Sequence, residues 1–163
     1  MLWVPQCIYA AHPDPDFTQP IQLSGDFLNI NLNTKNSIYK GNFVAVQGSM
    51  KLESHEMQVQ QKPNNELDTI IAVGKPVRFQ KKNYQTGELI QGQAEKITYD
   101  ANKLFLILQG NAEIKINSGK NFKAAIITYG LTSGEIEAKG DRQQRVQITI
   151  PPNKTKQNLP IRE

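Results

Sequence analysis

Few side chains in this sequence could carry out acid–base or metal chemistry. Glu53 and Glu56 flank His55, and a carboxylate beside an imidazole is a combination that can hold or relay a proton. The same three residues also suit the wet outer face of a strand, and we expect that role. Cys7 is the single cysteine and His12 the other of two histidines, so the sequence predicts no intramolecular disulfide and no Cys/His metal site.

A second acidic pair, Asp14 and Asp16, lies in a proline-spaced segment, where we expect a solvated turn rather than paired catalytic carboxylates. The sequence contains no nucleophile elbow, no phosphate-binding glycine loop and no dinucleotide fingerprint. It therefore predicts a protein that is not an enzyme, with no catalytic residue, no metal and no cofactor.

Length and charge narrow the remaining classes. The 163 residues suit one domain, and a net charge of +4 favours an anionic partner such as phosphate, a lipid headgroup or nucleic acid. A small basic excess is also common on solvated surfaces. No surface strand interleaves aromatic residues with arginine or lysine, so we expect no nucleic-acid binding. No apolar run reaches the roughly 20 residues that cross a bilayer as a helix.

Composition divides the chain into three parts. Residues 1–11 are apolar, end in small residues and resemble the end of a signal peptide. Residues 12–152 form the expected domain. Residues 153–163 follow two prolines, lack an alternating pattern and are predicted to be a flexible basic tail.

Apolar residues recur at every second position through most of the chain, which predicts β-strands. Turn-forming groups such as 33–36, 62–65, 83–87 and 117–119 separate these segments. No segment shows a sustained apolar stripe of helical period, so we expect an all-β fold with one helical turn near the start at most.

The longest alternating segment is Lys103–Ile116, KLFLILQGNAEIKI, whose apolar positions would share one face of an extended strand. Its Gly110–Asn111 repeats an earlier Gly41–Asn42 at a similar place between strands. A glycine inside a strand suits a bulge or bend, and we favour that reading over a simple turn that would divide each strand in two.

Six short motifs in order give the chain its resemblance to a known family. They are QPI (19–21), YKGNFVAVQG (39–48), GKPVRF (74–79), GQA with ITY (92–99), LQGNA (108–112) and ITY (127–129). Together they resemble the OstA-like family of periplasmic lipopolysaccharide-transport proteins, over about residues 19–152.

The resemblance implies an open, V-shaped antiparallel β-jellyroll whose interior is a hydrophobic groove for the acyl chains of lipopolysaccharide. It implies a periplasmic bridge between the two membranes, built from copies joined head to tail, with LptC as the inner-membrane partner and LptD as the outer-membrane partner. The residues expected in the groove are Ile30, Leu32, Phe43, Phe79, Tyr99, Leu104, Leu106, Leu108, Ile114 and Ile116.

The same resemblance assigns two edges. Ile21 and Leu23 fall on the N-terminal strand that meets LptC, and Val146, Ile148 and Ile150 fall on the C-terminal strand that meets LptD or the next copy. Alternating strands alone also fit a self-assembling structural β protein that carries no lipid. A related lipopolysaccharide-assembly module, such as the periplasmic part of LptC or the N-terminal part of LptD, is a third reading.

Overall fold

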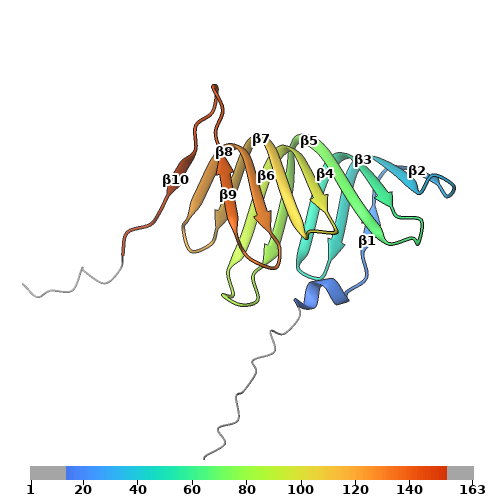
Figure 1. Ribbon diagram of the computed structural model, residues 1–163, viewed down its shortest axis with the longest axis horizontal. Coiled ribbons are helices and arrows are strands. Elements are labelled where there is room, and N and C mark those ends of the chain that lie inside the picture. The colour runs from blue at the N-terminus through green and yellow to red at the C-terminus, as the bar shows by residue number, and fades with distance from the viewer. Residues whose placement is uncertain (1–13, 154–163) are drawn as a thin grey trace, which may run out of the picture.

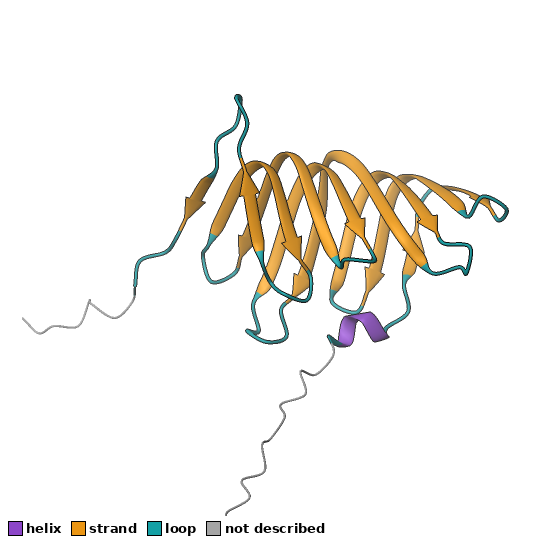
Figure 2. Cartoon of the chain, viewed as in Figure 1, coloured by secondary structure: helices purple, strands orange, loops and turns teal. Residues whose placement is uncertain are grey.

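The alternating segments fold as strands of one continuous antiparallel sheet. The computed structural model describes residues 14–153, which contain one 3₁₀ turn and ten strands (Figure 1). In chain order the elements are η1 (Pro15–Thr18), β1 (Gln22–Ser24), β2 (Phe27–Asn31), β3 (Asn36–Gln47), β4 (Met50–Gln61), β5 (Leu67–Lys82), β6 (Leu89–Asp100), β7 (Phe105–Ile116), β8 (Asn121–Gly130), β9 (Ile136–Lys139) and β10 (Gln147–Thr149). Figure 2 shows how little of this part of the chain is helical.

Strands that follow one another in the chain lie side by side in the sheet. The main order is β1-β3-β4-β5-β6-β7-β8-β10, and the two remaining short strands, β2 and β9, pair with β3 and β8. β3 therefore carries β2 along residues 36–40 and β1 along 44–46. β8 likewise carries β9 along 126–129 and β10 along 121–123. Each end of the sheet is thus closed by two short strands rather than one long strand.

A line of irregularities crosses the sheet and bends every long strand. Each pairing among β3 to β8 shifts register near its middle. In β3 and β7 the bend falls at Gly41–Asn42 and Gly110–Asn111, and all four of these residues have positive φ angles. The two bends share one device, because each asparagine donates its side-chain amide to a carboxylate, that of Asp26 at 2.9 Å and that of Glu95 at 2.8 Å. The repeated Gly-Asn pair therefore marks bulges, as predicted.

The bend divides the sheet into two arms whose inner faces pack on each other. We call the arm that includes β1 and β10 the first arm, and the arm that includes β2 and β9 the second arm. Contact between them is close: a Cβ added to Gly92 of the first arm would lie 3.1 Å from the Leu108 side chain of the second. Buried residues of both arms, from Tyr39 to Leu131, form one core cluster.

This architecture confirms the predicted all-β, open antiparallel jellyroll and the single helical turn near its start. One boundary was wrong: the strand predicted over Lys103–Ile116 begins at Phe105, because Leu104 has a φ of 55° and lies in the turn before it. The expected signal-peptide remnant at 1–11 and nearly all of the expected tail at 153–163 lie outside the described residues.

Candidate functional site

Three rows of inward-facing side chains run across the sheet from one edge to the other. Residues paired across antiparallel strands point to the same face, so the rows can be followed through the register. The first arm holds Leu23, Ala45, Leu52, Phe79, Gly92, Ile114, Phe122 and Ile148. The second arm holds Leu28, Tyr39, Met57, Ala72, Ile97, Leu108, Ile127 and Ala138 in one row, and Ile30, Ser37, Val59, Ile70, Tyr99, Leu106, Tyr129 and Ile136 in the other.

An open hollow lies between the arms near the N-terminal edge. The first arm and the segment before β1 contribute Ile21, Ala45, Val46, Gln47, Met50, Lys51, Leu52 and Phe79, and the second arm contributes Leu67, Ile70, Tyr99, Leu106 and Leu131. Most of these side chains are aliphatic or aromatic. The lining therefore favours an apolar ligand, because transfer of each CH₂ group from water stabilises by about 0.8 kcal/mol.

The tyrosines of the interior stay neutral. Burial raises the pKa of Tyr129 to about 12, with a further contribution from the charge of Asp14. Burial and the neighbouring Asp100 carboxylate also raise the pKa of Tyr99. The inner face of the second arm therefore carries no tyrosinate charge at neutral pH.

Most of the residues predicted for the groove lie on the inner face. Phe43, Phe79, Leu106, Leu108 and Ile114 are buried, while Tyr99 and Ile116 are partly buried against the same core. The hollow itself touches only three of the ten predicted residues, namely Phe79, Tyr99 and Leu106.

Two predicted groove residues lie outside the strands, and a third lies on the inner face but is exposed. Leu32 is 75% exposed in the turn after β2, and Leu104 lies in the turn before β7, so neither is an inward strand position. Ile30 does share a face with Ser37, but it is 51% exposed because β2 is an edge strand with no further strand beyond it.

The predicted edge residues lie at the two ends of the first arm. Leu23 is in β1 and Ile148 in β10, with Ile21 just before β1, and Val146 and Ile150 on either side of β10. All five are exposed large hydrophobic residues, and Ile150 is 71% exposed. In Figure 1, β10 stands at one end of the row of strands and β2 at the other, beside β1.

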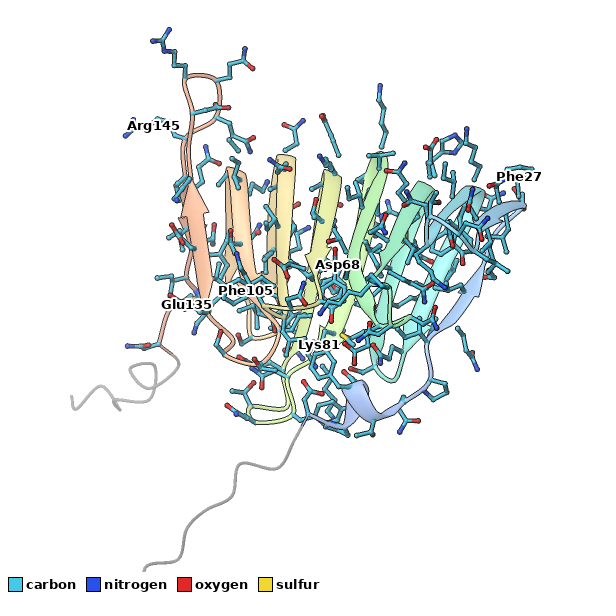
Figure 3. All side chains as sticks on the ribbon, turned by 45° about the vertical axis from the view of Figure 1, so that its right-hand side comes forward. Phe27, Asp68, Lys81, Phe105, Glu135 and Arg145 are labelled. Atoms are coloured by element: carbon cyan, nitrogen blue, oxygen red, sulfur yellow. The ribbon has the colours of Figure 1, made fainter. Side chains whose placement is uncertain are left out.

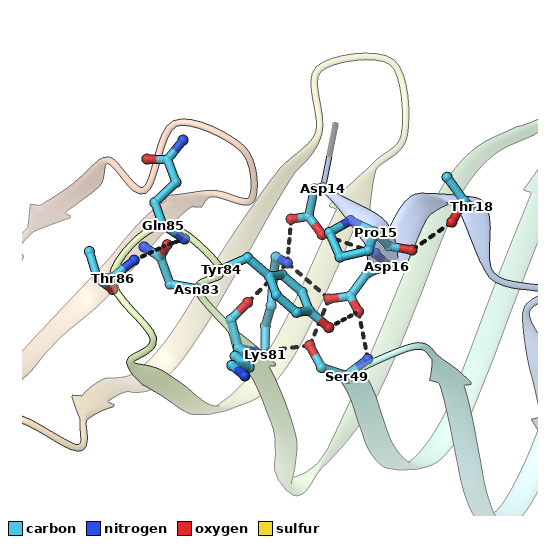
Figure 4. A network of polar contacts seen from close by, with 11 residues as sticks. Asp14, Pro15, Asp16, Thr18, Ser49, Lys81, Asn83, Tyr84, Gln85 and Thr86 are labelled. Carbon is cyan, nitrogen blue, oxygen red and sulfur yellow. Dashed lines mark hydrogen bonds and ion pairs between the residues drawn. The ribbon is translucent and has the colours of Figure 1, made fainter. Parts of the chain in front are cut away.

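A polar network that the sequence did not predict closes one end of the interior (Figure 4). Lys81 is only 1% exposed and pairs with the carboxylates of Asp14 and Asp16. Asp16 also accepts hydrogen bonds from Ser49 and Tyr84. Burial opposes the charge of Asp16, but the hydrogen bonds from Ser49 and Lys81 outweigh it and lower the pKa of this carboxyl group. The acidic pair expected in a solvated turn is thus part of a buried ion network, and that expectation was wrong.

The other acid–base candidates do not form a reaction site. His55 is exposed, Glu53 pairs with Lys51 at 2.6 Å and Glu56 lies 3.9 Å from Lys40. Within residues 14–153 no three His, Cys, Asp or Glu side chains are grouped to hold a metal ion. In the same range no helix is long and apolar enough to cross a membrane.

Fold and site together define an open β-jellyroll whose apolar interior reaches both edges of the sheet. The family model described as LptA/(LptD N-terminal domain) LPS transport protein matches residues 22–135. The chain therefore belongs to this family of lipopolysaccharide transport proteins.

Similar proteins are named for lipopolysaccharide export or transport. Lipopolysaccharide export system protein LptA of Haemophilus influenzae is 27% identical over 144 residues, covering 87% of this chain and 83% of that protein. LptA of Escherichia coli K12 is 27% identical over 140 residues, covering 85% and 74%. The crystal structure of LptH, the LptA-homologous periplasmic component of the lipopolysaccharide transport device of Pseudomonas aeruginosa, matches with a TM-score of 0.78 at 22% identity. It covers 84% of this chain and 99% of that one, which supports the fold.

Proposed function

We propose that this protein carries lipopolysaccharide through the periplasm by holding the acyl chains between its two arms. The observation that carries the proposal is the set of three inner rows, which present mostly apolar side chains from one edge of the sheet to the other. Burial of acyl chains needs no covalent chemistry. The role is therefore that of a carrier rather than an enzyme, and it needs no cofactor.

Passage along the rows requires that no position binds the lipid much more tightly than its neighbours. Leu106, Leu108, Ile97 and Ile127 are similar in size and polarity, so an acyl chain would meet similar surroundings at successive strands. Such a groove gives no direction by itself. Direction then comes from an energy source elsewhere, and the protein supplies a shielded path.

The two ends of the sheet would join partners by strand addition. Edge strands offer unpaired backbone N–H and C=O groups, and pairing through them supplies affinity while side chains supply selectivity. In the proposed bridge the end with Ile21 and Leu23 meets LptC, and the end with Val146, Ile148 and Ile150 meets LptD or the next copy. Because the two ends differ, such contacts are heterologous and extend head to tail.

The test is a photo-crosslinking residue at Leu106, in cells that are actively exporting lipopolysaccharide. Leu106 is 3% exposed and lines the hollow, whereas the matched control Lys115 points outward with its side chain 59% exposed. A second probe at the partly buried Tyr99 guards against disturbance of the core at Leu106.

Lipopolysaccharide adducts at Leu106 and Tyr99 but not at Lys115 are the expected result. Protein adducts alone, or no adducts in a protein that still folds, would overturn the groove. They would leave these residues as ordinary core and favour a self-assembling structural protein.

A further inference from the structure

Four hydrogen-bond donors of the jellyroll converge on the carboxylate of Asp16. The Ser49 N–H and the Tyr84 hydroxyl donate to Oδ1 at 2.6 and 3.0 Å, and the Ser49 hydroxyl and Lys81 Nζ donate to Oδ2 at 2.6 and 2.9 Å (Figure 4). The donors come from the β3–β4 turn, the end of β5 and the β5–β6 turn. Asp16 comes from the segment Asp14–Thr18 before β1, which we call the strap. We call the donor groups of Ser49, Lys81 and Tyr84 the cradle. The strap, a separate segment, thus fills an anion-binding site made by the rest of the fold.

The cradle is built for an anion rather than for this carboxylate in particular. The Lys82 N–H donates to the Ser49 oxygen at 3.0 Å, which orients the Ser49 hydroxyl proton toward the acceptor. Lys81 is in register with Ile90 and so faces the interior, where it is 1% exposed. A buried ammonium group without an anion is strongly disfavoured. If the strap leaves, another anion must take its place.

The cradle lies at the rim of the apolar hollow. Ser49 directly precedes Met50, and Lys81 lies two positions after Phe79; both Met50 and Phe79 line the hollow. Figure 3 shows Lys81 at the lower end of the strands, near the strap. An amphiphile whose chains fill the hollow would place its polar end here.

We propose that Ser49, Lys81 and Tyr84 form a phosphate-binding site for the headgroup of the carried glycolipid, and that Asp16 occupies this site when no lipid is bound. The proposal rests on the proposed function and adds a polar anchor to its apolar groove. A phosphate monoester presents more oxygens than a carboxylate and takes the same donors, of which the charged one gives the strongest bonds.

The experiment compares dodecyl phosphate, dodecanol and inorganic phosphate by calorimetric titration of the full chain, with both amphiphiles below the concentration at which they aggregate. The expected dissociation constant of dodecyl phosphate is about tenfold below that of dodecanol, as one charge-assisted hydrogen bond would give. Inorganic phosphate should bind more weakly than dodecyl phosphate, because it gains nothing from the hollow.

Three variants and a control identify the cradle. K81M should remove the preference for dodecyl phosphate while dodecanol binds as before, and Y84F, which keeps the ring and loses one donor, should reduce the preference severalfold. D16N should strengthen binding of dodecyl phosphate, because a neutral side chain competes less for Lys81. K115M removes an exposed lysine of the outer face and should leave the preference unchanged.

If K81M still prefers dodecyl phosphate to dodecanol, or if D16N does not strengthen the binding of dodecyl phosphate, the proposal of a phosphate site is overturned. The proposal of an apolar groove would then still stand. Binding of dodecyl phosphate without binding of dodecanol would keep the phosphate site and count against the groove. Equal binding of dodecyl phosphate and inorganic phosphate would identify a site for free phosphate rather than for a lipid headgroup.

Discussion

Replacing Gly110 with alanine should destabilise the fold more than replacing Gly87, although the two glycines have similar φ angles of 78° and 74°. A positive φ costs a residue with a side chain about 1–2 kcal/mol, and the less flexible unfolded chain offsets about 0.4–1 kcal/mol of this. A Cβ at Gly87 would meet nothing within 4 Å. The free energy of unfolding should therefore fall by about 1 kcal/mol in Gly87→Ala.

The same Cβ at Gly110 would lie 2.7 Å from Glu95 Oε2 and 3.1 Å from Glu95 Cβ. Glu95 would have to swing away and lose its exposed hydrogen bond with Asn111, which adds about 1 kcal/mol and gives a total of about 2 kcal/mol. At Gly41 the Cβ would lie 2.9 Å from the Cβ of Asp26, whose shorter side chain moves less freely. We expect Gly41→Ala to lower the free energy of unfolding by about 3 kcal/mol.

Urea unfolding followed by far-ultraviolet circular dichroism measures all three variants, with Gly87→Ala as the matched control. A Glu95→Ala background removes the carboxylate but keeps the Cβ at 3.1 Å, so Gly110→Ala should cost less than in the parent chain and come close to the loss in Gly87→Ala. Equal losses at the three glycines, or no rescue by Glu95→Ala, would refute the reasoning that close carboxylates require glycine at the bends.

Four further outcomes are expected. Leu108→Ala should lower the free energy of unfolding by about 2–5 kcal/mol in denaturant titrations, because Leu108 is fully buried; a loss below about 1 kcal/mol would contradict its core position. Ile148→Asp should weaken self-association in sedimentation experiments yet change monomer stability by no more than about 0.5 kcal/mol, since Ile148 is 54% exposed; unchanged association would exclude this edge. Tyrosinate absorbance should show an ionisation near pH 12 that Tyr129→Phe removes. Because the pKa of Tyr129 is higher in the folded than in the unfolded chain, the neutral Tyr129 contributes fully to the free energy of unfolding below about pH 10, and this contribution is lost toward pH 12. Folding lowers the pKa of Asp16, so its contribution to the free energy of unfolding is complete above about pH 4 and is lost in acid. When the free energy of unfolding is measured against pH, Asp16→Asn should therefore show a smaller decrease on the acid side than the parent chain.

The strands could be predicted because their pattern is local. Side chains of a strand alternate between faces, so a half-buried strand reads as apolar at every second residue. The pattern changes phase at the bends: in β5 the buried residues are Ile70 and Ala72 before the bend, but Val77 and Phe79 after it. In β3, β5 and β7 a glycine, at position 41, 74 or 110, marks the change of phase, so the two halves of these strands can be read separately.

Strand ends were less predictable than strands. Leu32 and Leu104 continue the alternation by one step into a turn, and alternation alone contains no stop signal. What ends β7 on its N-terminal side is the positive φ of Leu104, together with the Asp100 carboxylate that accepts from the backbone N–H groups of Asn102 and Lys103. The turn therefore extends to Leu104, whereas the alternating pattern placed Lys103 and Leu104 in the strand.

The strap could not be found from a local pattern, because Asp16 meets Lys81 across 65 residues of sequence. One signal pointed to it. Lys81 continues the inward phase of Val77 and Phe79, and a lysine at an inward position needs an anion close by. The proline-spaced aspartates were candidates for that anion, and Pro15 after Asp14 is typical of a capped helical start.

The inner rows also limit how copies of the chain can join in the proposed bridge. The row of the first arm starts at Leu23 in β1 and ends at Ile148 in β10, and both side chains face the interior. When β10 of one copy pairs with β1 of the next, the groove stays continuous only if Ile148 of the one and Leu23 of the other both remain on the inner face. A slip of one residue would turn every apolar side chain of the added strand toward water. The exposed Ile21, Leu23, Ile148 and Ile150 therefore do more than add apolar area at the edges: they favour the registers in which the groove of one copy continues into the next.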